Sequence, residues 1–174
     1  MNLYKNKILK LKLRDNSTQL VKDRIDKSEV ISRTQDGINE VVVYWGLDEM
    51  TELNQIINFN NNNLPSPITK DYDWAGIYKP FKHQRITSEF FFIKKKRGFC
   101  FNEAGTGKTS SALWAADYLM NKGKIKRVLI ICPLSIMYSA WQADIFNTCM
   151  HRTSQVCHST ADKRGTIIIS NYDV

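Results

Sequence analysis

A glycine-rich turn at residues 98–109 constrains the fold of this chain more than any other feature. Its sequence is Gly-Phe-Cys-Phe-Asn-Glu-Ala-Gly-Thr-Gly-Lys-Thr. The apolar residues Phe99–Phe101 predict a short strand, and Ser110–Met120 have a helix-forming composition. Gly105 and Gly107 permit backbone angles that are closed to other residues. A strand, a glycine turn and a helix N-terminus in this order predict a cradle for nucleotide phosphates, because backbone N–H groups and the helix dipole attract anions there.

The end of this turn has the chemistry that phosphate and magnesium require. The Lys108 ammonium would reach the β- and γ-phosphates and the Thr109 hydroxyl would coordinate Mg²⁺, so both are predicted catalytic residues. Asn102 stands where the full Walker A pattern has glycine, and asparagine tolerates a left-handed turn. The alternative is a glycine turn that only joins a strand to a helix. The predicted nucleotide contacts are Glu103, Ala104, Gly105, Thr106, Gly107, Lys108, Thr109 and Ser110.

The composition is that of a globular protein with a basic surface. The chain has 174 residues, of which 43% are hydrophobic and 24% charged, which suits one domain plus an appendage. Lys and Arg exceed Asp and Glu by 25 to 17, which favours a polyanionic partner, with a merely basic solvated surface as the alternative. No apolar stretch reaches the roughly 18 residues of a membrane span, and no secretory signal is evident. The four cysteines are too few for a disulfide scaffold, so we expect an intracellular protein without a membrane partner, in the cytoplasm, the nucleoid or, if viral, the host cell.

The first part of the chain has the pattern of a small β-rich region. Residues 3–14 alternate between apolar and basic side chains, which predicts a half-buried strand. Its two faces carry Leu9, Leu11 and Leu13 and, opposite them, Lys10, Lys12 and Arg14. Further strands are expected within 19–33 and at 41–45, with a short helix at 48–58. A cluster of asparagines and prolines follows, so we expect an N-terminal region at 1–64, a linker at 65–79 and a second region at 80–174.

The second part alternates between helices and strands. The pattern predicts a helix from Lys82 with Ile86, Phe90 and Ile93 on one face, closed by the cationic run Lys94–Arg97. Val128–Cys132 and Thr166–Ile169 are continuous apolar runs, which are typical of strands buried on both faces. Between them, Pro133 precedes a helix that aligns Ile136, Ala140 and Ala143. This alternation predicts an α/β fold with a parallel sheet and with ligands at the carboxyl ends of the strands.

Four motifs in this second part resemble those of the superfamily-two helicases, specifically the Swi/Snf-type DNA-dependent ATPases, including the compact kind found in phages. Asn102–Thr109 is similar to the first motif of that family, Asp-Glu-Met-Gly-Leu-Gly-Lys-Thr. Cys132–Ser135, followed by Trp141 and Asp144, is similar to the next motif, and Ser170–Asp173 matches Thr-Thr-Tyr-Glu more loosely. Phe81–Gln84 stands where the family has its glutamine motif. The resemblance covers about residues 76–174.

The resemblance implies a partial RecA-like lobe that binds ATP with Mg²⁺. In such a lobe Gln84 would hydrogen-bond the adenine edge, because its amide offers a donor and an acceptor together. The ends of the two strands would contact the DNA backbone without reading its sequence. The residues implied for this contact are Pro133, Ser135, Ser170, Asn171 and Tyr172.

The family's activity also depends on motifs that follow those present here. An Asp-Glu motif on the next strand positions Mg²⁺ and the attacking water, and a second lobe supplies an arginine finger, whereas this sequence ends at Val174. We therefore expect a truncated lobe that binds nucleotide without hydrolysing it by itself and that pairs with the remainder of a helicase or with a partner chain. The alternative is a non-catalytic basic module that binds nucleic acid or a partner enzyme. A phosphate-loop kinase is disfavoured, since the Cys-Pro-Leu-Ser and Ser-Asn-Tyr-Asp motifs would then have no purpose.

Overall fold

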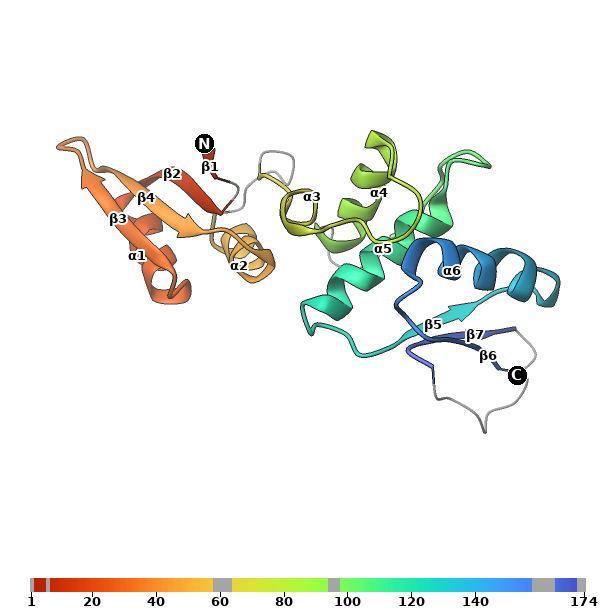
Figure 1. The fold of residues 1–174 in the computed structure, drawn as a ribbon. Helices are drawn as coiled ribbons and strands as arrows, with labels where there is room; N and C mark the ends of the chain where they lie inside the picture. Colours follow the sequence, from red (N-terminus) through yellow and green to blue (C-terminus); the bar gives the residue numbers. More distant parts are fainter. Residues whose placement is uncertain (1, 6, 58–63, 94–97, 158–164, 172–174) are drawn as a thin grey trace. The chain divides into compact units, whose positions relative to one another are not determined.

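The computed structural model shows two compact units. It describes residues 2–5, 7–57, 64–93, 98–157 and 165–171 (Figure 1). The first unit is Met1–Tyr72 and the second is Asp73–Val174. The division falls inside the stretch 65–79 that the sequence assigns to a linker, and the predicted boundaries at 64 and 80 stay predictions.

The first unit is an antiparallel sheet with helices packed on it. Its elements are β1 (Asn2–Tyr4), β2 (Ile8–Arg14), α1 (Asp15–Arg24), β3 (Ser28–Arg33), β4 (Ile38–Tyr44), α2 (Leu47–Ile57) and α3 (Pro67–Asp71). The strands lie in the order β1-β2-β4-β3 (Figure 1). Exposed and buried residues alternate along all of β2, with Leu9, Leu11 and Leu13 buried. The predicted half-buried strand with a basic outer face is therefore confirmed for β2.

Helix α1 is a correction to the sequence prediction, which placed only strands within residues 19–33. Thr18, Val21 and Ile25 are buried at spacings of three and four residues, the spacing of one helix face. Since that face packs inward, the helical period overrides the strand interpretation up to Arg24. The second half of the segment forms β3, as the sequence predicts.

The remaining predictions for this unit have different outcomes. The strand expected at 41–45 is confirmed as part of β4. The stretch 3–14 is divided into two strands, because Lys5 has a φ of +46°, in the left-handed region, between β1 and β2. The predicted helix at 48–58 is confirmed, since α2 spans Leu47–Ile57 with Met50 and Leu53 buried.

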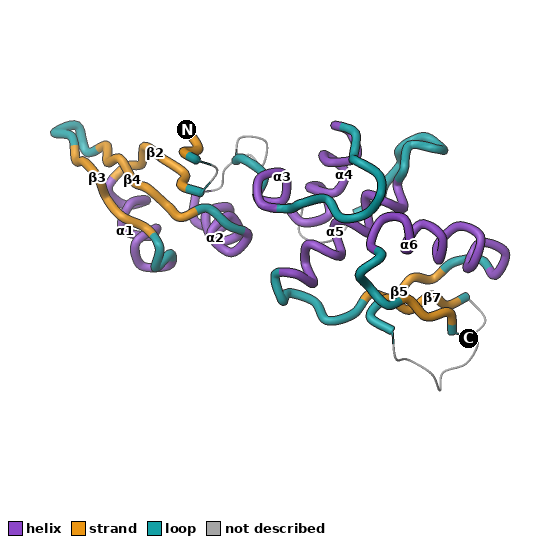
Figure 2. The backbone as a smooth tube through the Cα atoms, in the orientation of Figure 1, coloured by secondary structure: helices purple, strands orange, loops and turns teal. Residues whose placement is uncertain are grey.

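The second unit is an α/β unit, and the three strands described in it are all parallel. Its elements are α4 (Lys82–Ile93), α5 (Lys108–Asn121), β5 (Val128–Ile131), a 3₁₀ turn (Leu134–Ile136), a π-helical turn (Met137–Gln142), α6 (Ala143–Cys149), β6 (Ser154–Val156) and β7 (Ile167–Ser170). The strand order is β5-β7-β6. Figure 2 shows α6 running alongside the strands of this sheet. One core joins α5, the π-helical turn and α6 to the sheet. Its buried residues are Leu113, Ile130, Cys132, Met137, Ile145, Cys149, Ile167 and Ile169.

The two buried-strand predictions have different outcomes. In β7, which lies between β5 and β6, Ile167, Ile168 and Ile169 are all buried. In β5 the prediction of burial on both faces is wrong, because Leu129 and Ile131 are 61% and 55% exposed. β5 is the edge strand of the described sheet, and the helices cover only its inner face.

The predicted strand before the glycine turn is also wrong. Residues 98–103 have no regular secondary structure, and Phe99 and Phe101 are 83% and 88% exposed. Their rings stack on each other with centroids 5.8 Å apart. A strand is stabilised by pairing with a neighbouring strand, and within the described residues no strand pairs with this segment.

Helix α4 forms where it is predicted, but Ile86 of the predicted apolar face does not enter the core. Ile86 is 56% exposed, whereas Thr87 and Ser88 are buried. The Ser88 hydroxyl donates to the Ser111 carbonyl of α5 at 2.9 Å. Small polar side chains let α4 approach α5 closely, so the side with Thr87 and Ser88 packs against α5. Phe90 of the predicted face is half-buried, and the Ile93 side chain lies outside the described residues.

The helix after Pro133 is likewise out of phase with its prediction. The alignment of Ile136, Ala140 and Ala143 is not buried, and Met137 and Ile145 enter the core instead. A π-helical turn accommodates more residues than an α-helical turn and so rotates the buried face relative to a regular 3.6-residue period.

Two sequence features lie outside the described residues, namely Lys94–Arg97 and Asn60–Asn63. Among the helices that the structure does describe, none has the length and apolar character needed to cross a bilayer.

Candidate nucleotide-binding site

The glycine turn forms the N-terminus of α5. Residues 103–107 make the turn, and 108–110 are the first residues of the helix. Gly105 and Gly107 have φ values of +76° and +75°, in the left-handed region that favours glycine. The first bond of the helix runs from the Ser111 N–H to the Gly107 carbonyl at 3.0 Å. The N–H groups that precede it have no intrahelical partner by helix geometry, so they are available to an anion.

Gln84 of α4 holds this turn from the side. Its Nε2 donates to the Thr106 carbonyl at 3.2 Å, and its Oε1 accepts from the Phe81 N–H at 2.9 Å. A Cβ atom on Gly107 would lie 2.1 Å from Gln84 Nε2, so a larger residue at this position would have to displace the Gln84 amide from its hydrogen bonds. Each amide atom retains capacity for another bond, because Nε2 has a second hydrogen and Oε1 a second lone pair.

Lys108 lies over the start of the turn. Its Nζ donates to the carbonyls of Asn102 and Glu103, both at 2.8 Å, which leaves one ammonium hydrogen for a further acceptor. The Asn102 side chain donates to the Thr87 hydroxyl of α4 at 3.0 Å. The departure from the Walker A glycine therefore has a structural role, since asparagine ties the turn to α4.

Helix α6 contacts the first turn of α5 through two residues that the sequence does not assign to the site. Burial raises the pKa of the Asp144 carboxyl above its ordinary value, and a hydrogen bond from the Thr109 hydroxyl partly opposes this rise. One turn further along α6, the Thr148 hydroxyl donates to the Ser110 hydroxyl at 3.3 Å. The spacing of four residues between Asp144 and Thr148 is the signal that could have predicted this pair of contacts.

A second polar cluster anchors the middle of α5. The Asp117 carboxylate, only 1% exposed, accepts from Arg152 Nε at 2.6 Å and is paired with His151 Nε2 at 2.8 Å. Arg152 also donates to the Asn121 side-chain carbonyl. Burial, with the nearby Asp117 carboxylate, raises the pKa of Cys149 to about 12, so that thiol is not a nucleophile. The cluster fixes α5 against the turn that enters β6.

The predicted nucleic-acid contacts lie at the carboxyl ends of β5 and β7. In the parallel register Ile131 is opposite Ser170, and the Cys132 N–H donates to the Ser170 carbonyl at 3.0 Å. This pairing brings Pro133 and Ser135 to the same sheet edge as Ser170 and Asn171. The Asn171 Oδ1 is buried and has no hydrogen-bond partner among the described residues. Tyr172 lies outside them.

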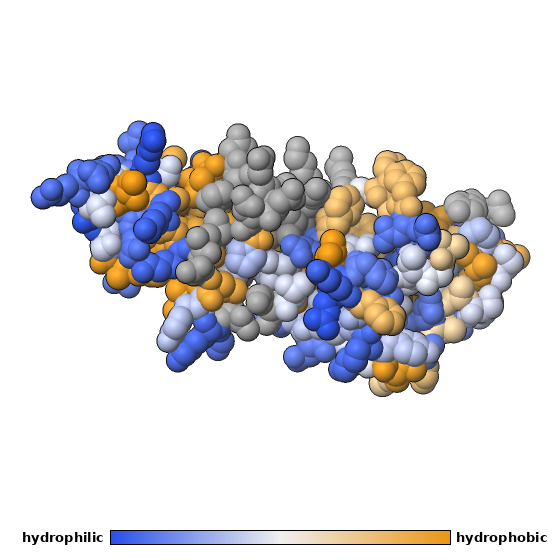
Figure 3. Space-filling view, turned by 90° about the horizontal axis from the view of Figure 1, so that it is seen from above, coloured by the Kyte–Doolittle hydropathy of each residue, from blue (hydrophilic) through white to orange (hydrophobic). Residues whose placement is uncertain are grey.

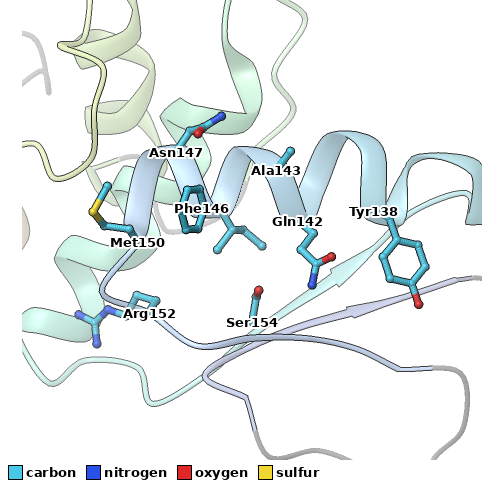
Figure 4. Close-up of a pocket in the computed structure, with 9 residues that line it drawn as sticks. Tyr138, Gln142, Ala143, Phe146, Asn147, Met150, Arg152 and Ser154 are labelled. Atoms are coloured by element: carbon cyan, nitrogen blue, oxygen red, sulfur yellow. The ribbon is translucent and has the colours of Figure 1, made fainter.

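A groove of about 460 Å³ lies on the same unit, between α6 with its preceding turn and strand β6 (Figure 4). Gln142 and Ser154 point toward one another across it (Figure 4). Tyr138, Phe146 and Met150 give it an apolar side. None of the residues predicted to bind nucleotide or nucleic acid lines this groove.

Comparison with known proteins agrees with this fold. The family described as "type III restriction enzyme, res subunit" matches residues 66–173. Among solved structures, the Sulfolobus solfataricus SWI2/SNF2 ATPase core in complex with dsDNA matches with a TM-score of 0.50 and 20% identity. The match covers 57% of this chain and 23% of that one, so this chain spans under a quarter of its length. Comparison with curated proteins gives no match. The partial RecA-like α/β fold predicted from the sequence is confirmed.

Proposed function

The chain belongs to the family of the type III restriction enzyme res subunit, and from that premise we propose that its second unit binds ATP as part of a DNA-dependent ATPase of the Swi/Snf type. The relationship to the superfamily-two helicases predicted from the four motifs is confirmed, and the second unit is a helicase-type nucleotide-binding region. The Swi/Snf type is supported by the Cys-Pro-Leu-Ser motif with Trp141 and Asp144.

The observation that carries the proposal is the geometry of the glycine turn. Two left-handed glycines lead directly into α5, and Lys108 is the first residue of that helix. Backbone N–H groups at the helix N-terminus would hold the β-phosphate of a nucleotide, and the Lys108 ammonium would supply a positive charge to its γ-phosphate. The positive end of the helix dipole adds to the attraction.

The contact between Thr109 and Asp144 supports a magnesium ligand at Thr109. A hydroxyl has one hydrogen and two lone pairs, and Thr109 donates its hydrogen to Asp144. Its lone pairs therefore face away from Asp144 and are available to a hard cation such as Mg²⁺. In this arrangement Asp144 is a positioning residue, because it acts on the metal through the orientation of the hydroxyl.

Gln84 is proposed to read adenine with the donor and the acceptor that remain on its amide. Its existing bonds to Thr106 and Phe81 hold the amide plane against the turn, so an adenine edge would meet an oriented group. Since the same two bonds also explain Gln84 as a purely structural residue, the adenine role needs its own measurement. Equal affinity for ATP and GTP would contradict it.

The strand ends are proposed to contact the backbone of DNA. Pro133 and Ser135 share a sheet edge with Ser170 and Asn171, and hydroxyl and amide groups there suit phosphate oxygens. The proposed contact includes Tyr172, whose place rests on the sequence alone. The second candidate function is a basic binding module without catalysis, which the exposed lysines of β2 favour.

The deciding experiment measures binding of a fluorescent ATP analogue with Mg²⁺ at millimolar concentration. We expect Lys108→Ala to abolish binding while the circular dichroism spectrum stays unchanged. Lys126→Ala, which removes an exposed lysine from the turn between α5 and β5, is the matched control and should bind like the wild type. Unaltered binding by Lys108→Ala, or no binding by the wild type, would overturn the nucleotide assignment and leave the basic binding module.

A further inference from the structure

The outer face of the first unit's sheet carries an aromatic row that the proposed function does not use. In the antiparallel register Tyr4 of β1 is opposite Ile8 of β2, and Ile8 is opposite Tyr44 of β4. The three side chains are 61%, 37% and 47% exposed. Their neighbours Leu9 and Val43 are buried on the other face. The row therefore crosses three strands on the solvent side of the sheet.

Both tyrosine rings are accompanied by cations. Lys5 Nζ lies 5.4 Å from the centroid of the Tyr4 ring, and Lys27 Nζ lies 5.3 Å from that of Tyr44. Lys10 and Lys12 follow Ile8 on the same face of β2. Such a face offers phosphate groups several cations close to aromatic surfaces.

Only part of this positive charge is neutralised within the sheet. Lys10 forms an ion pair with Glu40 of β4 at 2.8 Å, and Glu40 is opposite Lys12 in the register. The hydrogen bond from Lys10 and the charges of Lys10 and Lys12 hold the pKa of Glu40 below its ordinary value, so this carboxylate is ionised at neutral pH. One carboxylate between two lysines leaves the strand basic.

A shallow hollow of about 300 Å³ opens beside the row. Ile8, Val42 and Tyr44 form its apolar part. Its polar part is formed by Asp26, Lys27, Ser28 and Glu29. A flat ring can stack on Tyr44 there, while carboxylate and hydroxyl groups at the side match the amino and carbonyl groups on the edge of a nucleobase. On the side that Figure 3 shows, hydrophilic and apolar residues of this unit lie next to one another.

We propose that this outer face, the β1-β2-β4-β3 face with Tyr4, Ile8 and Tyr44, binds single-stranded nucleic acid. Bases stack on the two tyrosines, and Lys5, Lys10 and Lys27 contact the phosphates. Bases of a duplex are stacked inside the helix and cannot reach a ring on a sheet face, so a single strand fits better than a double one. The core of a protein–protein interface is depleted in lysine, which argues against a protein partner on this face.

The test measures fluorescence anisotropy of a labelled oligo-dT with the whole chain in the absence of nucleotide. Two substitutions of Tyr44 distinguish stacking on an aromatic ring from contact with an apolar side chain of another shape. Tyr44→Phe retains the ring and should bind like the wild type, whereas Tyr44→Leu should lose about tenfold in affinity. Tyr78→Ala, which removes another exposed tyrosine outside this face, is the control and should have no effect.

A second measurement locates the contact directly. Ultraviolet crosslinking of an iodouracil-labelled strand, followed by peptide mapping, should give adducts at Tyr44 or Tyr4. The proposal fails if Tyr44→Leu binds like the wild type, if the adducts map elsewhere, or if a duplex of equal length binds more tightly than the single strand. Lys108→Ala should leave all of these results unchanged, so a failure here is distinguishable from a failure of the nucleotide site.

Discussion

Asp117 in the second unit and Glu40 in the first are both carboxylates paired with cations, yet their environments differ. The Asp117 carboxylate is 1% exposed and is paired with Arg152 and His151, which come from the chain segment between α6 and β6. Glu40 lies on the open face of its sheet, and its partner Lys10 is 46% exposed. The same kind of pair therefore stabilises packing in one unit and lies within a solvent-facing surface in the other.

The two proposed ligand sites differ in a similar way, because one is built from backbone groups and the other from side chains. The glycine turn is built from backbone groups, and it depends on α5 being held by α4 near Gly107 and by the Asp117 cluster further along the helix. The outer face of the first unit is built from side chains, and its sheet is held by the leucine and valine core on the opposite side. Substitutions should accordingly affect folding and binding together in the second unit, and separately in the first.

The largest effect is expected from Arg152→Ala. The substitution leaves the buried Asp117 carboxylate with only part of its compensation, and breaking one partner of a buried pair costs about 3 kcal/mol of unfolding free energy. Urea unfolding followed by tryptophan fluorescence measures this loss. Arg127→Ala, which removes an exposed arginine before β5, is the matched control and should change the unfolding free energy by less than about 0.5 kcal/mol. Equal unfolding curves for the two variants would contradict a stabilising role for the cluster.

The next largest effect is a difference between alanine substitutions at Gly105 and at Gly107, two glycines of the same turn. Both have left-handed φ angles, so alanine at either position costs about 1 kcal/mol in backbone strain. A Cβ on Gly105 would meet nothing within 4 Å, whereas a Cβ on Gly107 would lie 2.1 Å from Gln84 Nε2. Gly107→Ala should therefore lose nucleotide binding and roughly 1 kcal/mol more of stability than Gly105→Ala. Similar losses for both variants would show that Gln84 moves aside without consequence.

The sequence predicts the second unit best where a motif fixes the chemistry. Gly107, Lys108 and Thr109 lie at a helix N-terminus as expected, because glycine conformation and helix capping are local properties. The strand at Phe99–Phe101 is wrong because a strand depends on a pairing partner, which the local pattern does not contain. Asp144 and Thr148 reach α5 only through tertiary packing, so their contacts were not predictable from the motif alone.

In the first unit, the alternation of apolar and basic residues predicts β2 correctly, and every leucine of this strand is buried. The same reasoning missed α1, because the polar residues of Asp15–Arg24 hide the helical spacing of Thr18 and Val21. The aromatic row was missed for another reason. Tyr4 and Tyr44 are far apart in the sequence, and only the register between β1, β2 and β4 places them on one face.

A smaller effect is expected from Asp144→Asn. An amide holds the Thr109 hydroxyl less strongly than a carboxylate, so the hydroxyl is less well oriented toward a metal ion. Affinity for nucleotide with Mg²⁺ should fall by about fivefold, or about 1 kcal/mol, and affinity in the presence of EDTA should not change. Titration of the fluorescent ATP analogue under both conditions measures the difference. Thr148→Val removes the neighbouring contact to Ser110 and is the control, since it should not alter the magnesium dependence. An equal loss with and without Mg²⁺ would mean that Asp144 only supports packing.

The smallest effect is expected from Glu40→Gln, which removes the exposed pair with Lys10. Lys10 lowers the pKa of Glu40 in the folded chain from 4.5, so the folded state binds the proton more weakly than the unfolded state does. The stabilisation from this pair is therefore fully present above the unfolded pKa and is lost as the pH falls through the lowered folded pKa. Urea unfolding followed by tryptophan fluorescence should show a small loss of unfolding free energy for Glu40→Gln at neutral pH that disappears in acid and in high salt. Glu52→Gln removes a carboxylate from α2 and controls for the general loss of negative charge.

Because the face is basic, Glu40→Gln should also strengthen binding of oligo-dT, whereas Glu52→Gln should not. This result would place the ligand on the strands rather than on the helices.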